Sequence, residues 1–363
     1  MSVLMGYMSR LFAARFALIF GGLVLLVLLL DVMAQSSEII AGDAGIMGLW
    51  RYSWLRLPLI ASRLIPFSVL IAALLTLIYL SRHQELVVMT GAGVSQFKLI
   101  AMFLPLVLVI VIGHFWIDDR ASPASIKALD AWGVAGYSAS RPSAQGAGGG
   151  TVLWVRAGND IIRLRQDGTI DADDHNRLGA LSIFSRDAEG NLIERLDAAS
   201  AINDSGAWTL YDVTQFDVAA NRLSKAAEMA WPGELLPSQI STLSSHPKAL
   251  PLSAVWRFVR APGYGSRPHY VYKTWLNRKL AVPLASLMMI LLAVPLTQRF
   301  QRHGGAASTL ALGVAIGFCF FVFDGFTLAV GESGLLPPWI AAWSPTLTFA
   351  AIGAGLGFHW ERR

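Results

Sequence analysis

Residues 80–98 lie between two long apolar runs and carry the side chains best suited to binding another protein. Charged and polar side chains begin this stretch, four apolar residues follow, and Gly91 and Gly93 end it. This order is typical of a short amphipathic helix that lies along a membrane face, and we expect one at about residues 82–93. Its acid is Glu85. From the residues alone, this carboxylate is either an ion-pairing group for a partner or a solvated acid.

A second group of interest lies in an apolar run near the C-terminus. Gly313 and Gly317 have the small-xxx-small spacing that lets two helices approach closely, so we expect them to serve packing. Asp324 follows in the same run, where a carboxylate costs roughly 2.5–3.5 kcal/mol on insertion scales and usually faces a cavity or a partner. Because Asp324 lies only six residues from Val330, an acid at the membrane interface is the other interpretation.

The sequence lacks the motifs of common enzymes. It contains no G-x-x-x-x-G-K-[ST] phosphate loop, no H-E-x-x-H and no G-x-S-x-G. Its seven histidines are dispersed without metal-ligand spacing, and its single cysteine, Cys319, lies in an apolar run. We therefore predict that the chain is not an enzyme and has no catalytic residue, no bound cofactor and no metal site.

Composition indicates an integral membrane protein. Hydrophobic residues make up 54% of the chain and charged residues only 15%, far from a soluble average. The net charge of +5 comes from basic residues scattered among short loops, so we predict no nucleic-acid binding. About twenty apolar residues suffice to cross a bilayer. A cleaved signal peptide is the alternative for the first apolar run. The predicted spans are residues 11–30, 57–80, 97–117, 280–296, 306–330 and 339–358.

Residues 118–272 differ from the rest, because most of the acidic residues lie there. Short β-branched and aromatic segments alternate with turn signals such as Asp167-Gly168, which predicts an antiparallel sandwich, jelly roll or open barrel. The predicted fold class is therefore an α-helical integral membrane protein with six transmembrane helices and an inserted all-β, jelly-roll-like domain. Helices one to three occupy residues 1–117, the β domain 118–272, and helices four to six 273–363.

The distribution of Lys and Arg beside the short loops predicts the orientation. The short connections on one side hold only Arg51 and Arg56. The other side holds Arg10, Arg15, Arg82, Lys98, Arg299, Arg302, Arg362 and Arg363. We predict that this second side is cytoplasmic, so that both termini and the 82–93 helix face the cytoplasm. The β domain would then face the periplasm of a cell with two membranes.

Three ordered motifs resemble those of the LptF/LptG lipopolysaccharide-export permeases. They are residues 84–89 followed by Gly91-Ala92-Gly93, the segment from Arg278-Lys279 to Pro283, and residues 334–338. The resemblance covers essentially the whole chain and is closer to LptG. It implies a Gram-negative inner-membrane permease that extracts lipopolysaccharide and passes it to a periplasmic β-jelly-roll bridge. The implied partners are an LptF-like permease, an LptB-like ATPase dimer that uses ATP and Mg, an LptC-like single-span protein and an LptA-like bridge.

The resemblance also implies roles for individual residues. The 82–93 helix would be the coupling helix, which inserts into a groove of the ATPase. Its contacting residues would be Glu85 as the ion-pairing group, Arg82 at the rim, and Leu86, Val88 and Met89 in the groove. Spans one and five would form the lateral gate for lipid. The gate and cavity residues would be Leu26, Gly313, Gly317, Phe320 and Asp324.

The first span departs from what a transporter of phosphorylated lipid should show. Cations are expected near its outer end as partners for phosphate, but the sequence has Asp31 and Glu38 there. Either the nearby cations contact the lipid phosphates, or the lipid carries fewer phosphates. The cations in question are Arg51, Arg56 and Arg63.

Lipid extraction needs an energy source outside this chain. Removing one twelve-carbon acyl chain from a bilayer costs about 10 kcal/mol, at roughly 0.8 kcal/mol per CH₂. The alternative function is a mechanotransmission or assembly permease, which couples a cytoplasmic ATPase to a periplasmic partner without moving lipid. A membrane-anchored periplasmic enzyme is a third class, for which residues 118–272 offer no convergent catalytic group.

Overall fold

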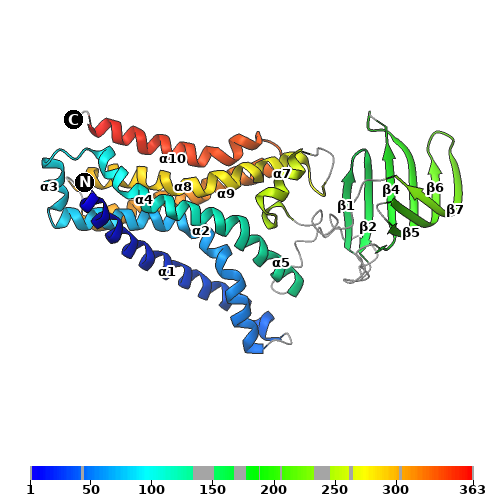
Figure 1. Ribbon diagram of the computed structural model, residues 1–363, viewed down its shortest axis with the longest axis horizontal. Coiled ribbons are helices and arrows are strands. Elements are labelled where there is room, and N and C mark those ends of the chain that lie inside the picture. The colour runs from blue at the N-terminus through cyan, green and yellow to red at the C-terminus, as the bar shows by residue number, and fades with distance from the viewer. Residues whose placement is uncertain are drawn as a thin grey trace. The chain divides into compact units, whose positions relative to one another are not determined.

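The chain folds into a helical unit and a β-sheet unit (Figure 1). The computed structural model describes residues 2–41, 45–133, 151–166, 177–187, 189–204, 207–232, 246–260, 265–301 and 305–361. One unit contains Met1–Ala135 and Lys273–Arg363, and the other contains Gly136–Tyr272. Within these described ranges, six helices are long and apolar enough to cross a membrane. The predicted class, a six-span membrane protein with an inserted β domain, is confirmed.

The helical unit contains the six spans and the short helix between the second and third. Its elements are α1 (Ser2–Ala41), α2 (Gly45–Arg82), α3 (Glu85–Gly91), α4 (Gln96–Trp116), the π-helical turn η1 (Ile117–Ala121), α5 (Ser122–Trp132), α8 (His269–Gln301), α9 (Ala306–Glu332) and α10 (Pro338–Glu361). At 1.5 Å per residue, the 40 residues of α1 are about 60 Å long, twice the thickness of the hydrocarbon core. Helices α1 and α2 therefore extend well beyond the runs that we predicted as spans.

The third span is longer than the sequence predicted. We expected the helix to end at residue 117 and the β domain to begin at Asp118. Instead, α4 continues through η1 into α5, and Gly133, with a φ of 72°, ends α5 after Trp132. The acidic residues of η1 suggested a polar connection. In the structure, Asp118 contacts Lys279 of α8, which compensates its charge and allows the helix to continue.

Helices α2 and α8 form the centre of the helical unit, since they are the most buried of the six spans. Leu70 and Leu74 of α2 and Leu292 of α8 are completely buried in one apolar core. Helix α1 is the least buried span. Its long apolar surface, like those of α4 and α9, is open to lipid or to another membrane protein.

Two glycines let α9 approach α2 closely. A Cβ atom at Gly313 would overlap the side chain of Leu74, and one at Gly317 would overlap the ring of Phe67. The small-xxx-small spacing therefore serves packing within this chain, as we expected.

The β unit contains one antiparallel sheet with the strand order β1-β2-β4-β5-β6-β7, and β3 pairs with β5. The strands are β1 (Thr151–Ala157), β2 (Asp160–Gln166), β3 (Arg177–Leu178), β4 (Leu181–Arg186), β5 (Leu192–Asp204), β6 (Ala207–Asp217) and β7 (Arg222–Trp231). Apart from β3, each strand lies beside its neighbours in the sequence. The described strands thus form an up-and-down meander (Figure 1).

The sheet curls around its own apolar core. Val155 of β1, Ile162 of β2 and Trp231 of β7 belong to one buried cluster. The indole nitrogen of Trp231 also donates to the carboxylate of Asp160 on β2 at 3.3 Å, which joins strands that are not neighbours in the sheet. Helix α7 (Leu252–Arg260) packs the side chain of Phe258 against this core.

The close approach of α9 to α2 predicts the effect of a bulkier residue. Gly317→Val should destabilise the protein by about 1–3 kcal/mol, because the added atoms overlap Phe67. The melting temperature of the purified protein in detergent measures this loss. Gly325→Val is the matched control on the same helix, since a Cβ at Gly325 meets nothing within 4 Å. Equal melting temperatures for the two variants would contradict this account of the packing.

Candidate functional site

Two tight turns set α3 apart from the spans on either side. At its start, Gln84 has a φ of 60°, and the Val88 amide donates to the Gln84 carbonyl at 3.1 Å. At its end, Gly93 has a φ of 83°, which favours glycine, and the Val94 amide donates to the Met89 carbonyl at 3.1 Å. Helix α3 thus forms a short connection between the end of α2 and the start of α4 (Figure 1).

The apolar side chains of α3 divide between its two faces. Leu86 and Met89 are only 3% and 8% exposed and belong to the apolar core of the helical unit. Val87 and Val88 are 57% and 70% exposed. The expectation that Leu86 and Met89 fill a groove of another protein is therefore corrected, because both side chains already pack within this chain. The exposed apolar surface of α3 consists of Val88, which we predicted, and Val87, which we did not.

Glu85 lies at the start of α3, beside the start of α1. The Tyr7 hydroxyl donates to Glu85 Oε1 at 3.2 Å. Eight residues further along α1, the Arg15 guanidinium lies over the ring of Tyr79 of α2, 4.3 Å from its centroid. The beginning of α1 is thus attached both to α3 and to the end of α2. Of the two charged residues that we predicted to contact a partner, Arg82 is exposed and Glu85 is half-buried.

At the opposite end of α1, an ion pair joins α1 to α2. Arg56 donates to Asp31 Oδ2 at 2.7 Å and to Oδ1 at 2.9 Å, and the Tyr52 hydroxyl donates to Oδ2 at 2.8 Å. Asp31, which the sequence left unexplained, therefore holds the two helices together. Arg56 is already engaged by Asp31, which weakens its candidacy as a phosphate contact.

The other two candidate cations have different surroundings. The Arg51 guanidinium lies over the ring of Trp132 at 4.7 Å, which ties α2 to α5. Arg63 is exposed on α2, and among the described residues it forms no hydrogen bond or ion pair within 4 Å. Of the three arginines, Arg63 is the one best placed to receive an external anion.

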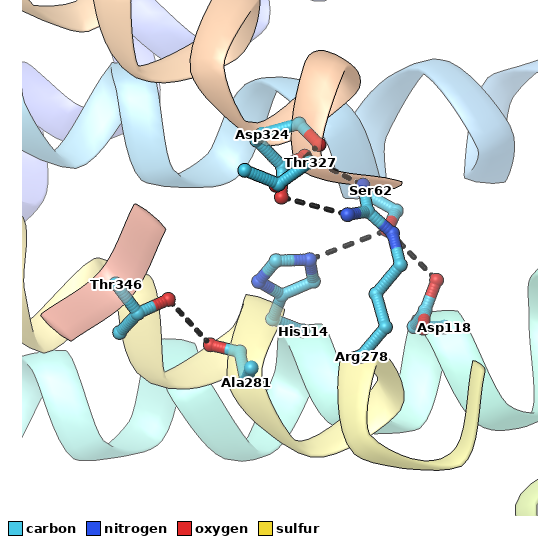
Figure 2. Close-up of polar contacts among 8 residues, drawn as sticks. All are labelled: Ser62, His114, Asp118, Arg278, Ala281, Asp324, Thr327 and Thr346. Carbon is cyan, nitrogen blue, oxygen red and sulfur yellow. Dashed lines mark hydrogen bonds and ion pairs between the residues drawn. The ribbon is translucent and has the colours of Figure 1, made fainter. Parts of the chain in front are cut away.

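Asp324 of α9 is paired with Arg278 of α8 (Figure 2). The guanidinium donates to both carboxylate oxygens, at 2.7 and 2.6 Å. The two side chains are only 17% and 14% exposed. The Thr327 hydroxyl donates to the Asp324 carbonyl at 3.2 Å. The acid in the fifth span thus faces a partner within the same chain, and bidentate geometry makes this pair strong.

A second buried polar cluster lies beside this pair and connects three helices (Figure 2). The Ser62 hydroxyl of α2 donates to Asp118 Oδ1 at 3.2 Å and lies 3.2 Å from His114 Nε2 of α4. Because a hydroxyl has one proton, His114 Nε2 must then donate to the Ser62 oxygen. The ammonium of Lys279, 3% exposed, donates to the Asp118 carbonyl at 3.0 Å and lies 3.9 Å from its carboxylate.

Sequence reasoning missed His114 and Lys279 as members of one cluster. His114 was one of several dispersed histidines, and Asp118 lies 161 positions before Lys279. One signal was present, because the adjacent cations Arg278 and Lys279 precede an apolar run and need counter-charges there. Only the fold shows that these acids come from η1 and α9. Among the described residues, no three His, Cys, Asp or Glu side chains are arranged to hold a metal ion.

Comparison with known proteins gives this architecture a family. Residues 6–357 match the family described as lipopolysaccharide export system permease LptF/LptG. The chain belongs to this family. It is 24% identical over 358 residues to the lipopolysaccharide export system permease protein LptG of Haemophilus influenzae, covering 92% of this chain and 93% of the relative. It is 25% identical over 328 residues to LptG of Escherichia coli K12, covering 87% and 86% of the two chains.

In this structure, the residues that we predicted for the lipid gate divide between exposed and buried positions. Leu26 is 53% exposed on α1. Phe320 is only 4% exposed and packs edge-on against Phe349 of α10, with ring centroids 5.3 Å apart. Together with Gly313, Gly317 and Asp324, Phe320 therefore belongs to the internal packing of α9 and does not line an open surface. The exposed aromatic residues on α9 are Phe318 and Phe326, at 65% and 63%.

The Arg278–Asp324 pair predicts a recognisable pattern of stabilities. Asp324→Leu should cost about 3–5 kcal/mol, because it leaves a buried guanidinium without a counter-charge. The double variant Arg278→Met with Asp324→Leu should recover most of this loss. Melting temperatures of the single and double variants in detergent measure the coupling between the two residues. A double variant no more stable than Asp324→Leu alone would show that the pair does not act as a unit.

Proposed function

We propose that this chain is the permease subunit of an ATP-driven exporter that extracts lipopolysaccharide from the inner membrane. The lipid would pass to a periplasmic bridge of β domains. Support comes from the family and from relatives that are named lipopolysaccharide export system permease proteins. The match to these relatives covers most of each chain. The balance of Lys and Arg supports an orientation with α3 and both termini in the cytoplasm and the β domain in the periplasm.

A separate ATPase would supply the energy, so that this subunit is not itself an enzyme and binds no cofactor. Its partners would be an LptF-like permease, an LptB-like ATPase dimer using ATP and Mg, an LptC-like single-span protein and an LptA-like bridge. The exposed apolar side chains along α1, α4 and α9 support contacts with lipid and with a second membrane protein.

The observation that carries the coupling role is the two-sided packing of α3. Leu86 and Met89 anchor α3 in the core, while Val87 and Val88 project from it. Glu85 lies beside this exposed pair, in the first turn. A helix that is fixed on one face and exposed on the other can transmit a push from an ATPase into the helical unit. Arg82 and Glu85 would form the charged contacts, and the two valines would fill the groove.

Reversing the charge at Glu85 should separate the ATPase from the permease. Glu85→Arg places a cation where we propose an ion pair with a cationic group of the ATPase, and like charges in an interface cost several kcal/mol. Copurification of the ATPase with tagged permease measures the loss. Tyr7→Phe is the control, because it removes the partner hydroxyl of Glu85 and keeps the carboxylate. An intact Glu85→Arg complex with unchanged lipid-stimulated ATP hydrolysis would overturn the coupling assignment.

Lipid contact is the part of the proposal that distinguishes a transporter from a mechanotransmission permease. Leu26 is exposed on α1, and Arg63 is an exposed cation on the adjacent α2. We propose that acyl chains pass along α1 and that Arg63 contacts a lipid phosphate. A photoreactive residue at Leu26 should then crosslink to lipopolysaccharide, whereas one at the buried Phe320 should not.

Arg63→Gln should reduce the crosslink from Leu26 about tenfold. A hydrogen bond to a charged group contributes about 1.5 kcal/mol, which corresponds to this factor. Arg120→Gln is the matched control, because the Arg120 side chain is 75% exposed at the same end of the helical unit. Unchanged crosslinking in Arg63→Gln would remove Arg63 from the lipid path. If Leu26 gave no crosslink even in the parent protein, the mechanotransmission alternative would be favoured.

A further inference from the structure

Helix α7 has a basic face that the proposed transport role does not use. Ala254 and Val255 are buried on one side of this nine-residue helix. The exposed residues follow at positions i, i+3, i+4 and i+7, so they form one stripe. They are Ser253, Trp256, Arg257 and Arg260. The Arg260 guanidinium lies over the ring of Trp256 at 4.9 Å.

Helix α7 contacts the first turn of α8, the helix that follows it in the chain. The ring of Phe258 stacks on Tyr272, with centroids 4.9 Å apart and planes inclined by 24°. Tyr272 lies in the first turn of α8. One turn further, about 4.5 Å along the helix, the indole of Trp275 donates to Glu332 of α9 at 2.6 Å. Tryptophans of this kind mark the headgroup level of a bilayer, and only eight residues of the chain separate the end of α7 from the start of α8.

The charge of this region is one-sided. Between residues 246 and 273 the sequence has no Asp or Glu. It has the cations Lys248, Arg257, Arg260, Arg267 and Lys273. With the proposed orientation, these cations lie on the outer side, so the preference of cations for the cytoplasmic side does not explain them. A basic stripe with an exposed tryptophan matches the features of helices that lie on anionic membranes.

We propose that α7 docks on the outer surface of the membrane. Trp256 enters the headgroup region, and Arg257 and Arg260 contact the phosphates of anionic phospholipids. Phe258 packs α7 against the core of the β unit, so docking would attach that unit to the bilayer. A stripe of four side chains is small compared with a stable protein interface, which buries more than about 1,000 Å². The charge and the size of the stripe therefore favour headgroups over a protein partner.

The distance of α7 from lipid headgroups can be measured in nanodiscs with the assembled complex. The chain has one cysteine, so Cys319→Ser gives a background in which Ser253→Cys carries a single fluorophore. A nitroxide on the lipid headgroup should quench this fluorophore strongly in discs that contain phosphatidylglycerol, and less in phosphatidylcholine alone. Arg257→Gln and Arg260→Gln should each lower the ratio of docked to undocked α7 about fivefold, which corresponds to about 1 kcal/mol per basic residue.

Matched controls come from β7 of the same unit. A fluorophore at Leu223→Cys, 61% exposed in the parent chain, should be quenched much less than one at position 253. Arg222→Gln with Lys225→Gln removes two exposed charges from β7 and should leave quenching at position 253 unchanged. Equal quenching at the two labelled positions, or no effect of the α7 arginines, would overturn the proposal.

One further outcome, and the independence of the measurement from transport, separate this inference from the proposed function. Quenching that depends on added lipopolysaccharide and not on phosphatidylglycerol would assign the stripe to the transported lipid and would also overturn the proposal. The measurement requires neither ATP hydrolysis nor lipid export. A failure of the transport proposal would therefore leave the quenching result intact, and a failure of docking would leave the coupling role of Glu85 untouched.

Discussion

The arrangement of the spans depends on the compensation of two adjacent cations in an apolar bundle. Arg278 and Lys279 follow one another on α8 and therefore point about 100° apart. Each must meet a counter-charge, because an unpaired buried charge costs several kcal/mol. Arg278 pairs with Asp324 on α9, and Lys279 pairs with Asp118 on η1. The two pairs restrict both the rotation and the sliding of α8 against its neighbours.

These pairs make a connected frame from four helices. Ser62 joins α2 to η1 and α4, and the glycines of α9 let it pack closely on α2. Helix α1 differs, since its contacts to α2 and α3 through polar side chains lie at Tyr7, Arg15 and Asp31. Its middle packs on α2 through an apolar cluster that contains Val24 and Ile60. Helix α1 therefore contributes no side chain to the two buried ion pairs of the frame.

In the coupling role that we propose for it, helix α3 would serve both stability and binding. Its seven residues are too few to form a stable helix alone, so the burial of Leu86 and Met89 in the core has to hold it in place. The same packing leaves Val87 and Val88 exposed at a fixed position. A mobile or fully exposed segment could bind a partner, but it could not transmit force to α2 and α4 as directly.

The sequence by itself determined the class of the protein, the number of spans, the antiparallel β insert and the position of the short helix. Each of these follows from local composition and periodicity, which the chain carries in contiguous segments. The partners of Asp31, Asp324 and Lys279 were decided only by the tertiary structure, because they lie on other helices. The same holds for which apolar side chains of α3 face inward and for the helical continuation through Asp118. A charged residue in a sequence belongs either to a segment in water or to a buried ion pair. Which of the two applies depends on whether a neighbouring helix supplies the opposite charge.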